Sequence, residues 1–307
     1  MAAFSVTFWG VRGSIACPGP DTLRYGGNTA CLEVRLGQRV VILDGGTGLR
    51  RLGAKLDRAG AVDADILFTH THLDHICGLP FFSSVYAQGN RFRLWAGHLL
   101  PAHTLREVLA EMMRAPLFPV PITVLGAELE FHDFSAGKPI DLGRGLEVRT
   151  AVLNDPNGAT GYRIEHAGRS LCYVTDTEHV PGRLDPNVVE LARGADLLVY
   201  DCTYTDAEYP RYAGWGHSTW EEGVRLCEAA GVRQGMESRL LVLRREILRQ
   251  NPVYHNAWRT LGAWLERFPK SSPEELDAIW ADFQKEVREA EVMRKEIQGV
   301  LAEPNLK

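Results

Sequence analysis

Short apolar runs, separated by polar or glycine- and proline-rich segments, recur along the first 232 residues of the chain. Runs of this length that are rich in β-branched and aromatic residues predict β-strands. We predict strands at residues 4–9, 30–36, 39–44, 63–68, 92–97, 146–152, 160–166, 169–176 and 195–201. Residues 46–60 carry apolar positions at helical spacing, and residues 101–117 predict a second helix. Strands and helices that alternate in this way favour an α/β architecture.

The pattern changes after Val232, where glycines and strand-like runs give way to helical periodicity. We therefore predict two parts, a domain at residues 1–232 and a helical extension at residues 233–307. Large apolar side chains recur in the extension near helical spacing, which is unusual for a solvated linker. We expect it to pack against the first domain or to join two copies of the chain as a homo-oligomer.

Bulk properties suit a cytoplasmic globular protein of 307 residues, with 45% hydrophobic residues and a formal net charge of −5. The mild acidity provides no overall electrostatic footprint for nucleic acid, although a local basic patch could exist. The 6 cysteines form no CxxC pair, and we expect them to be reduced. No apolar stretch reaches the ~20 residues of a membrane helix, so no membrane association is expected.

The segment FTHTHLDHICG, at residues 68–78, directly follows the strand-like run DADILF. Polar residues of this kind also occur on ordinary solvated loops, but here they cluster where a buried strand ends. His70 and His72 can face one ion, and the Asp74–His75 pair can reach another. Imidazole and carboxylate ligands together favour zinc, manganese or iron over calcium. The motif therefore predicts two metals side by side, with the 101–117 helix over the same face.

Four further stretches, together with HxHxDH, give the chain a family resemblance. They are FWGVRGS with RYGGNTACLEV, ILDGGTGLRRLG, YVTDTEH, and the segment from LLVYDCTYTD through GWGHSTW to AAGV. In this order they resemble metallo-β-lactamase-fold hydrolases. The similarity is strongest to the phosphodiesterase branch, which includes the tRNA 3′-processing endonucleases and the cyclic-phosphate phosphodiesterases of phosphonate breakdown. The resemblance implies an αββα sandwich with a dinuclear metal site at one edge.

The resemblance also implies roles for individual residues. His70 and His72 would bind the first metal, Asp74 and His75 the second, and Asp176 would bridge both. His217 of GWGHSTW would be a catalytic acid or would orient substrate, and Asp74 is counted with it as a candidate catalytic residue. Asp176 could instead be a strand-end turn residue, and His217 a packed core histidine. Asp44 is expected to support the metal loop by hydrogen bonding.

Two positions depart from the family pattern. Where relatives carry a histidine in an LNHPGG-like turn, this chain has LNDPNG, so Asp155 occupies the position of the third ligand to the first metal. Asp155 is a ligand or only a turn residue, because Asp-Pro-Asn-Gly also has strong turn chemistry. The last-strand histidine of relatives is missing, and His255 is the one histidine beyond His217. We expect two zinc ions, the second held weakly or not at all, with manganese or iron as alternatives.

The implied activity is hydrolysis of a phosphodiester by metal-activated water, the substrate being a cyclic nucleotide, a nucleic-acid end or a small phosphodiester. The absence of a long basic insertion weighs against structured RNA. Two alternatives remain open. The chain could be a non-catalytic scaffold that acts through its helical extension, or an esterase or lactonase that uses the same metals on a carbonyl group.

Overall fold

Two β-sheets form the framework of the protein in the computed structural model, which describes residues 4–19, 22 and 25–232. The first sheet has the order β1-β2-β3-β4-β5-β6, made of β1 (Phe4–Gly10), β2 (Cys31–Leu36), β3 (Arg39–Leu43), β4 (Asp63–Phe68), β5 (Arg91–Ala96) and β6 (Glu128–Asp133). The second has the order β11-β10-β9-β8-β7, made of β7 (Ile140–Asp141), β8 (Glu147–Leu153), β9 (Ala159–His166), β10 (Arg169–Val174) and β11 (Leu197–Tyr200). Each sheet is therefore built from one continuous half of the described chain.

Strand direction decides which loops meet at the sheet edges. Strands β3, β4, β5 and β6 run parallel, and β10 runs parallel to β11. The other neighbouring pairs, β1–β2, β2–β3, β7–β8, β8–β9 and β9–β10, are antiparallel. The carboxyl ends of the parallel strands thus lie at a common edge, where the loops after β3 and β4 come together.

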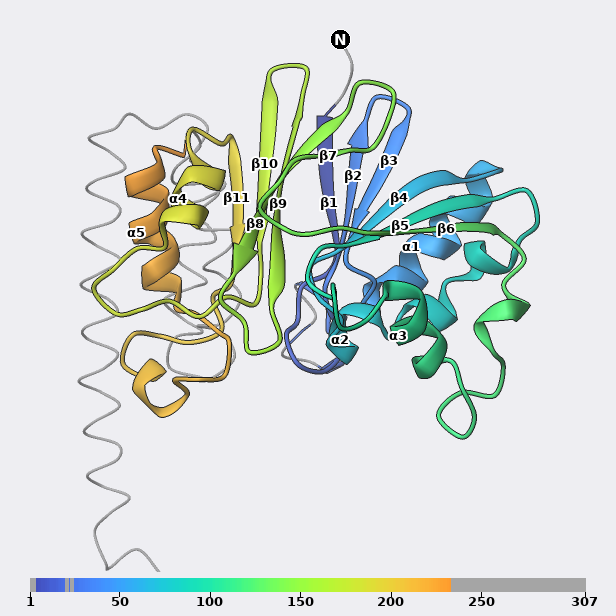
Figure 1. Cartoon of the computed structure of the whole chain (residues 1–307), viewed down its shortest axis with the longest axis horizontal. Helices are drawn as coiled ribbons and strands as arrows, with labels where there is room; N and C mark the ends of the chain where they lie inside the picture. Colours follow the sequence, from blue (N-terminus) through green and yellow to red (C-terminus); the bar gives the residue numbers. More distant parts are fainter. Residues whose placement is uncertain (1–3, 20–21, 23–24, 233–307) are drawn as a thin grey trace, which may run out of the picture. The chain divides into compact units, whose positions relative to one another are not determined.

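Helices cover the outer faces of the two sheets (Figure 1). The α-helices are α1 (Gly48–Leu56), α2 (Leu73–Ile76), α3 (Leu105–Met112), α4 (Pro186–Ala192) and α5 (Trp220–Ala230). Short 3₁₀ turns are η2 (Asp57–Ala59), η3 (Leu79–Phe81), η4 (Ser83–Tyr86), η5 (Ile122–Val124) and η6 (Tyr209–Arg211). Helices α1 and α3 contact the first sheet, whereas α4 and α5 contact the second. This is the αββα sandwich that the resemblance implied.

The alternation of side chains along the strands explains how the layers pack. On β3, Val40 and Ile42 join the core under the helices, and Val41 and Leu43 join the core between the sheets. Successive strand residues point to opposite faces, so a strand that is apolar on both faces is buried on both. The second sheet has its own helix-side core, in which Leu191 and Leu226 pack.

The predicted strands and the predicted helix at residues 46–60 are observed, but the second predicted helix is shorter and several observed elements were not predicted. The predicted helix at residues 101–117 is shorter, because a capping box between Thr104 and Glu107 starts α3 at Leu105. Strands β6 and β7 and helix α4 were not predicted. The helical extension predicted at residues 233–307, with His255 and the proposed oligomer contact, lies outside the described residues.

Candidate metal centre

The histidine motif occupies the loop after β4 and the short helix α2. His70 and His75 are each 1% exposed. The ring centroid of His70 lies 4.4 Å from that of His72 and 4.2 Å from that of His75. Burial, and then the proximity of His75, lower the pKa of His70 well below its ordinary value. This lowered pKa favours the neutral imidazole, the form that binds a metal.

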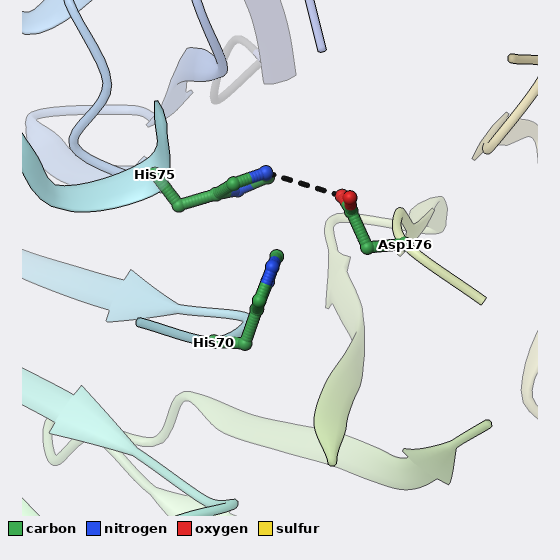
Figure 2. A group of neighbouring side chains, drawn as sticks. All are labelled: His70, His75 and Asp176. Carbon is green, nitrogen blue, oxygen red and sulfur yellow. Dashed lines mark ion pairs between the residues drawn. The ribbon is translucent and has the colours of Figure 1, made fainter. Parts of the chain in front are cut away.

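His75 lies between two carboxylates that come from different sheets. Its Nδ1 is 2.9 Å from Oδ2 of Asp44, and its Nε2 is 3.1 Å from Oδ2 of Asp176. Figure 2 shows His75 and Asp176 pointing toward one another, with the His70 ring directed at the space between them. Burial opposes ionisation of His75, but Asp176 and then Asp44 raise its pKa well above the ordinary value.

Several hydrogen bonds fix the carboxylate of Asp44 in place. Its carboxylate accepts the Thr69 N–H at 2.8 Å and the Tyr173 hydroxyl at 2.9 Å, in addition to its contact with His75. Asp44 and Asp176 both have left-handed backbone, with φ of 61° and 52°. Non-glycine residues adopt this conformation at a cost, which frequently accompanies functional sites. Asp44 thus has the supporting hydrogen bonds that the sequence analysis expected.

Asp74 faces the same space as His75. Its Oδ2 lies 3.4 Å from Nε2 of His75 and accepts the Ser14 N–H at 2.8 Å. Burial raises the pKa of Asp74, but the hydrogen bond and charge of His75 outweigh it, and the net shift is downward. The glycine-rich loop after β1 therefore contributes a main-chain donor that holds this carboxylate in place.

Asp155 lies on the other side of His70, beside His72. His70 Nε2 is 2.9 Å from His72 Nδ1, and ligand atoms of His70, His72 and Asp155 all lie within 4.8 Å of one another. Asp155 also accepts the Asn157 N–H at 3.0 Å, which is the turn bond expected of Asp-Pro-Asn-Gly. Asn157 in turn lies 3.1 Å from Nε2 of His72 through its side-chain amide. The turn geometry and the ligand position are thus compatible.

His217 belongs to a third group, which includes a residue that the sequence analysis missed. His217 Nδ1 is 3.0 Å from Oδ2 of Asp201 and 3.5 Å from Oδ1 of Asp176. Burial opposes its ionisation, but Asp201 and then Asp176 raise the pKa of His217 to about 9. Asp201 directly follows the apolar strand β11, just as Asp44 follows β3, and that shared pattern could have identified it.

Three overlapping sets of side chains could hold metal ions: His70, His75 and Asp176; His70, His72 and Asp155; and Asp176, Asp201 and His217. The donor atoms within each set lie within 4.8 Å of one another. Unpaired polar side chains are costly to bury, and here all seven residues are imidazoles or carboxylates, four of them buried, drawn from separate loops toward one space. The nitrogen and oxygen donors fit zinc, manganese or iron.

Residues 39–237 match the family described as Beta-lactamase superfamily domain. The chain belongs to this family. The HxHxDH motif lies inside the matched segment, as do Asp155, Asp176 and His217. Membership in the beta-lactamase superfamily agrees with the αββα sandwich and with the resemblance inferred from the motifs.

Curated relatives of this beta-lactamase superfamily chain include proteins named ribonuclease Z. The one from Haloarcula marismortui is 26% identical over 269 residues, covering 74% of this chain and 82% of the relative. The one from Haloferax volcanii is 35% identical over 105 residues, which is 34% of this chain and 29% of the relative. The chain therefore matches less than a third of the Haloferax protein's length but most of the Haloarcula protein's.

Solved structures with the same fold include human tRNase Z, short form, at a TM-score of 0.54 and 18% identity, covering 75% of this chain and 89% of that one. A diphosphatase from the PhnP family also has a TM-score of 0.54, at 21% identity and with 74% and 83% covered. At these identities the structures establish the fold alone. Within the described part of the chain, no helix is both long and apolar enough to span a membrane.

Proposed function

We propose that this protein is a metal-dependent hydrolase of phosphodiesters, with a nucleotide or nucleic-acid substrate. The observation that carries the proposal is the sharing of residues among the three donor sets, because His70 and Asp176 each belong to two of them. Such sharing suits metal ions held side by side, since a bridging carboxylate offsets the repulsion between two cations.

The residues divide between two metal positions in this proposal. His70, His72 and Asp155 would hold the first ion, and Asp74 and His75 the second, with Asp176 shared. When bound, the ions would supply Lewis-acid charge to a phosphoryl group and make water more acidic. Asp44, through its bond to His75 Nδ1, leaves Nε2 of that ring directed at the second position.

His217 would act as the proton donor to the leaving oxygen. Asp201 and Asp176 contact its Nδ1, and among the described residues none is hydrogen-bonded to its Nε2. Despite burial, Asp201 contributes most to raising the pKa of His217 to about 9, which favours the protonated ring near neutral pH. An imidazolium beside the metal positions can release its proton to a developing alkoxide, which is general acid catalysis.

The substrate class is inferred from relatives. Proteins named ribonuclease Z cover most of the chain at about a quarter identity, and human tRNase Z and a diphosphatase share the fold. These names have phosphate ester or anhydride chemistry in common, which supports a phosphodiester over a carboxylic ester. A non-catalytic scaffold is the competing candidate, favoured by Asp155 at a histidine position.

The test is turnover by the full chain loaded with zinc or manganese, with bis(p-nitrophenyl) phosphate compared against p-nitrophenyl acetate. We expect hydrolysis of the phosphodiester. With a dinucleotide, whose leaving group is an alkoxide, His217→Ala should lower kcat by about 10²- to 10⁴-fold, the usual contribution of a general acid. With bis(p-nitrophenyl) phosphate, whose p-nitrophenolate leaves without a proton, the loss should be much smaller. Exposed His103→Ala is the matched control and should retain native kcat. Metal-loaded protein that hydrolyses neither ester would favour the scaffold, and turnover of the acetate alone would favour an esterase.

A further inference from the structure

Trp215 is a large aromatic residue whose side chain is exposed to solvent beside the candidate centre. It is 66% exposed and lies two positions before His217. A single exposed apolar residue usually needs no explanation. An indole on a rigid loop is different, because ordering the loop costs conformational entropy that burial of the side chain does not offset. The loop around Trp215 is fixed in this way.

Glu178 fixes that loop by binding the main chain on both sides of Trp215. Its carboxylate accepts the Gly214 N–H at 2.7 Å and the Gly216 N–H at 2.9 Å. The hydroxyl of Tyr209 donates to the same carboxylate at 3.0 Å. Because the two bonded amides flank Trp215, the backbone at the tryptophan cannot turn inward without breaking one of them.

Two tyrosines connect the tryptophan to the candidate centre. Tyr212 stands edge-on to Trp215, with ring centroids 5.7 Å apart and an interplanar angle of 81°. Tyr212 is stacked on Tyr204 at 4.4 Å and 2°, and Tyr204 lies 6.0 Å from the ring of His217. We call Tyr204, Tyr212 and Trp215 the aromatic ladder. It runs from the proposed proton donor to an exposed indole.

We propose that Trp215 is a stacking platform for a nucleobase of the substrate. This inference rests on the proposed function, because His217 lies at the scissile phosphate there, and whatever lies on Trp215 would be joined to that phosphate. A nucleobase is the planar group that adjoins a phosphodiester in a nucleotide. Aromatic side chains bind bases through their π-faces with little sequence preference. The glycines on both sides add no side chain that could shade the indole.

The first experiment compares two activated diesters that differ in one group, thymidine 5′-(p-nitrophenyl phosphate) and methyl p-nitrophenyl phosphate. The readout is the ratio of their kcat/KM values. Trp215→Ala should lower this ratio by about fivefold or more, the effect expected for loss of one base stack. Trp215→Phe should keep it within about twofold, because a phenyl ring still stacks. Leu117→Ala, at another exposed apolar residue, should leave it at the native value.

The second experiment measures binding without turnover, using adenosine 5′-monophosphate and ribose 5-phosphate in calorimetry with the metal-loaded chain. Trp215→Ala should weaken binding of the nucleotide by about fivefold or more relative to the sugar phosphate. Glu178→Gln should do the same with the tryptophan present, since Gln cannot accept both amides as a carboxylate does. Equal losses for both ligands, or none, would overturn the platform.

The two proposals fail separately. If neither diester is hydrolysed but the nucleotide binds in a Trp215-dependent way, the platform is supported and phosphodiester hydrolysis is overturned. If both diesters are hydrolysed with a ratio that Trp215→Ala leaves unchanged, the hydrolase is supported and the platform is overturned.

Discussion

Gly216 packs closely against the Asp155 turn of the candidate centre. A Cβ placed on Gly216 would lie 2.6 Å from Cδ of Pro156 and 2.7 Å from Oδ2 of Asp155. Gly216 also has a left-handed backbone, with φ of 78°. The position of Asp155 therefore depends on the absence of a side chain at residue 216, in the segment that carries His217.

Gly216→Ala is expected to destabilise the protein and to weaken metal binding. The left-handed conformation alone costs about 1–2 kcal/mol for alanine, and the clash should add about 1–3 kcal/mol. Gly182→Ala is a close control, because Gly182 has φ of 76° and open space around its Cβ position. Chemical unfolding and metal analysis of both variants would test this. Equal losses would show that the contact with Asp155 is unimportant.

The sequence identified most of the candidate residues because they lie in one short motif or directly after a strand. Six consecutive positions contain His70, His72, Asp74 and His75, so the motif is recognised as a unit. Asp201 has the same position, directly after an apolar strand, as Asp44, but its pairing with His217, 16 residues away, has no local signal. The role of Glu178 was not predicted, because its hydrogen-bond donors are main-chain N–H groups of a distant loop, which no pattern of side chains reveals.

At the scale of elements, β4 carries charge at one end and the histidine motif at the other. Asp65 of β4 is fully buried and pairs with Arg39 of β3 at 2.9 Å and Arg93 of β5 at 2.8 Å. Trp95 also donates to it at 3.2 Å. This cluster joins three adjacent parallel strands through side chains in addition to their main-chain bonds.

Asp65→Asn should cost about 3 kcal/mol or more of unfolding free energy, because it leaves two partly buried guanidinium groups without their shared charge. Asp63→Asn, two residues earlier on β4, is the matched control. Its side chain is 39% exposed and pairs with Arg93 and Arg144, so its loss should cost less than about 1 kcal/mol. Urea titration of the two variants would measure the difference, and similar costs would contradict the argument.

A carboxyl group in helix α5 is expected to make the stability of the protein depend on pH. Burial raises the pKa of Glu221, at its first turn, from 4.5 to about 7. The folded chain thus holds this proton more tightly than the unfolded chain. The protonated Glu221 carboxyl therefore contributes fully to the free energy of unfolding below pH 4.5, and this contribution is lost as the pH rises through 7. Glu221→Gln should therefore stabilise the protein at pH 8 by roughly 1 kcal/mol, a value reduced for partial exposure, and by little at pH 5.

Thermal unfolding at the two pH values would test this, with exposed Glu228→Gln on the same helix as the control. A stabilisation by Glu221→Gln that is equal at both pH values would show that ionisation of this carboxyl is not the cause.

Elements that were missed have weak local patterns. Strand β6 reads ELEFHD, in which charged residues interrupt the apolar positions, and it lies at the edge of its sheet. Edge strands face solvent and need less apolar sequence. Strand β7 has only 2 residues. The start of α3 could have been found, since Thr104 and Glu107 have the spacing of a capping box.

At the scale of the whole molecule, the candidate centre draws on both sheets. His70, His72, Asp74 and His75 follow β4 of the first sheet, whereas Asp155, Asp176, Asp201 and His217 follow strands β8, β10 and β11 of the second or lie beyond them. A metal ion that binds only this assembled arrangement stabilises the folded chain by mass action.

Zinc at about 100 times its dissociation constant should add about 2.7 kcal/mol, or roughly 5–10 °C in Tm for a domain of this size. A chelator should reverse the shift, and a His70→Ala, His72→Ala double variant should lose most of it. Metal titration should also give two separate affinities or one ion per chain. A shift in the double variant as large as the native one would place the metal elsewhere.

The sequential construction of the sheets has a consequence for dissection of the chain. All strands of the first sheet end by Asp133, and the second sheet begins at Ile140. A cut in this connection would separate the histidine motif from every carboxylate of the second sheet without interrupting a strand. The cut would divide both donor sets that contain His70, and it would leave Asp176, Asp201 and His217 together on the second fragment. Metal binding by the histidine motif that is recovered only on mixing would therefore report reassociation of the two halves.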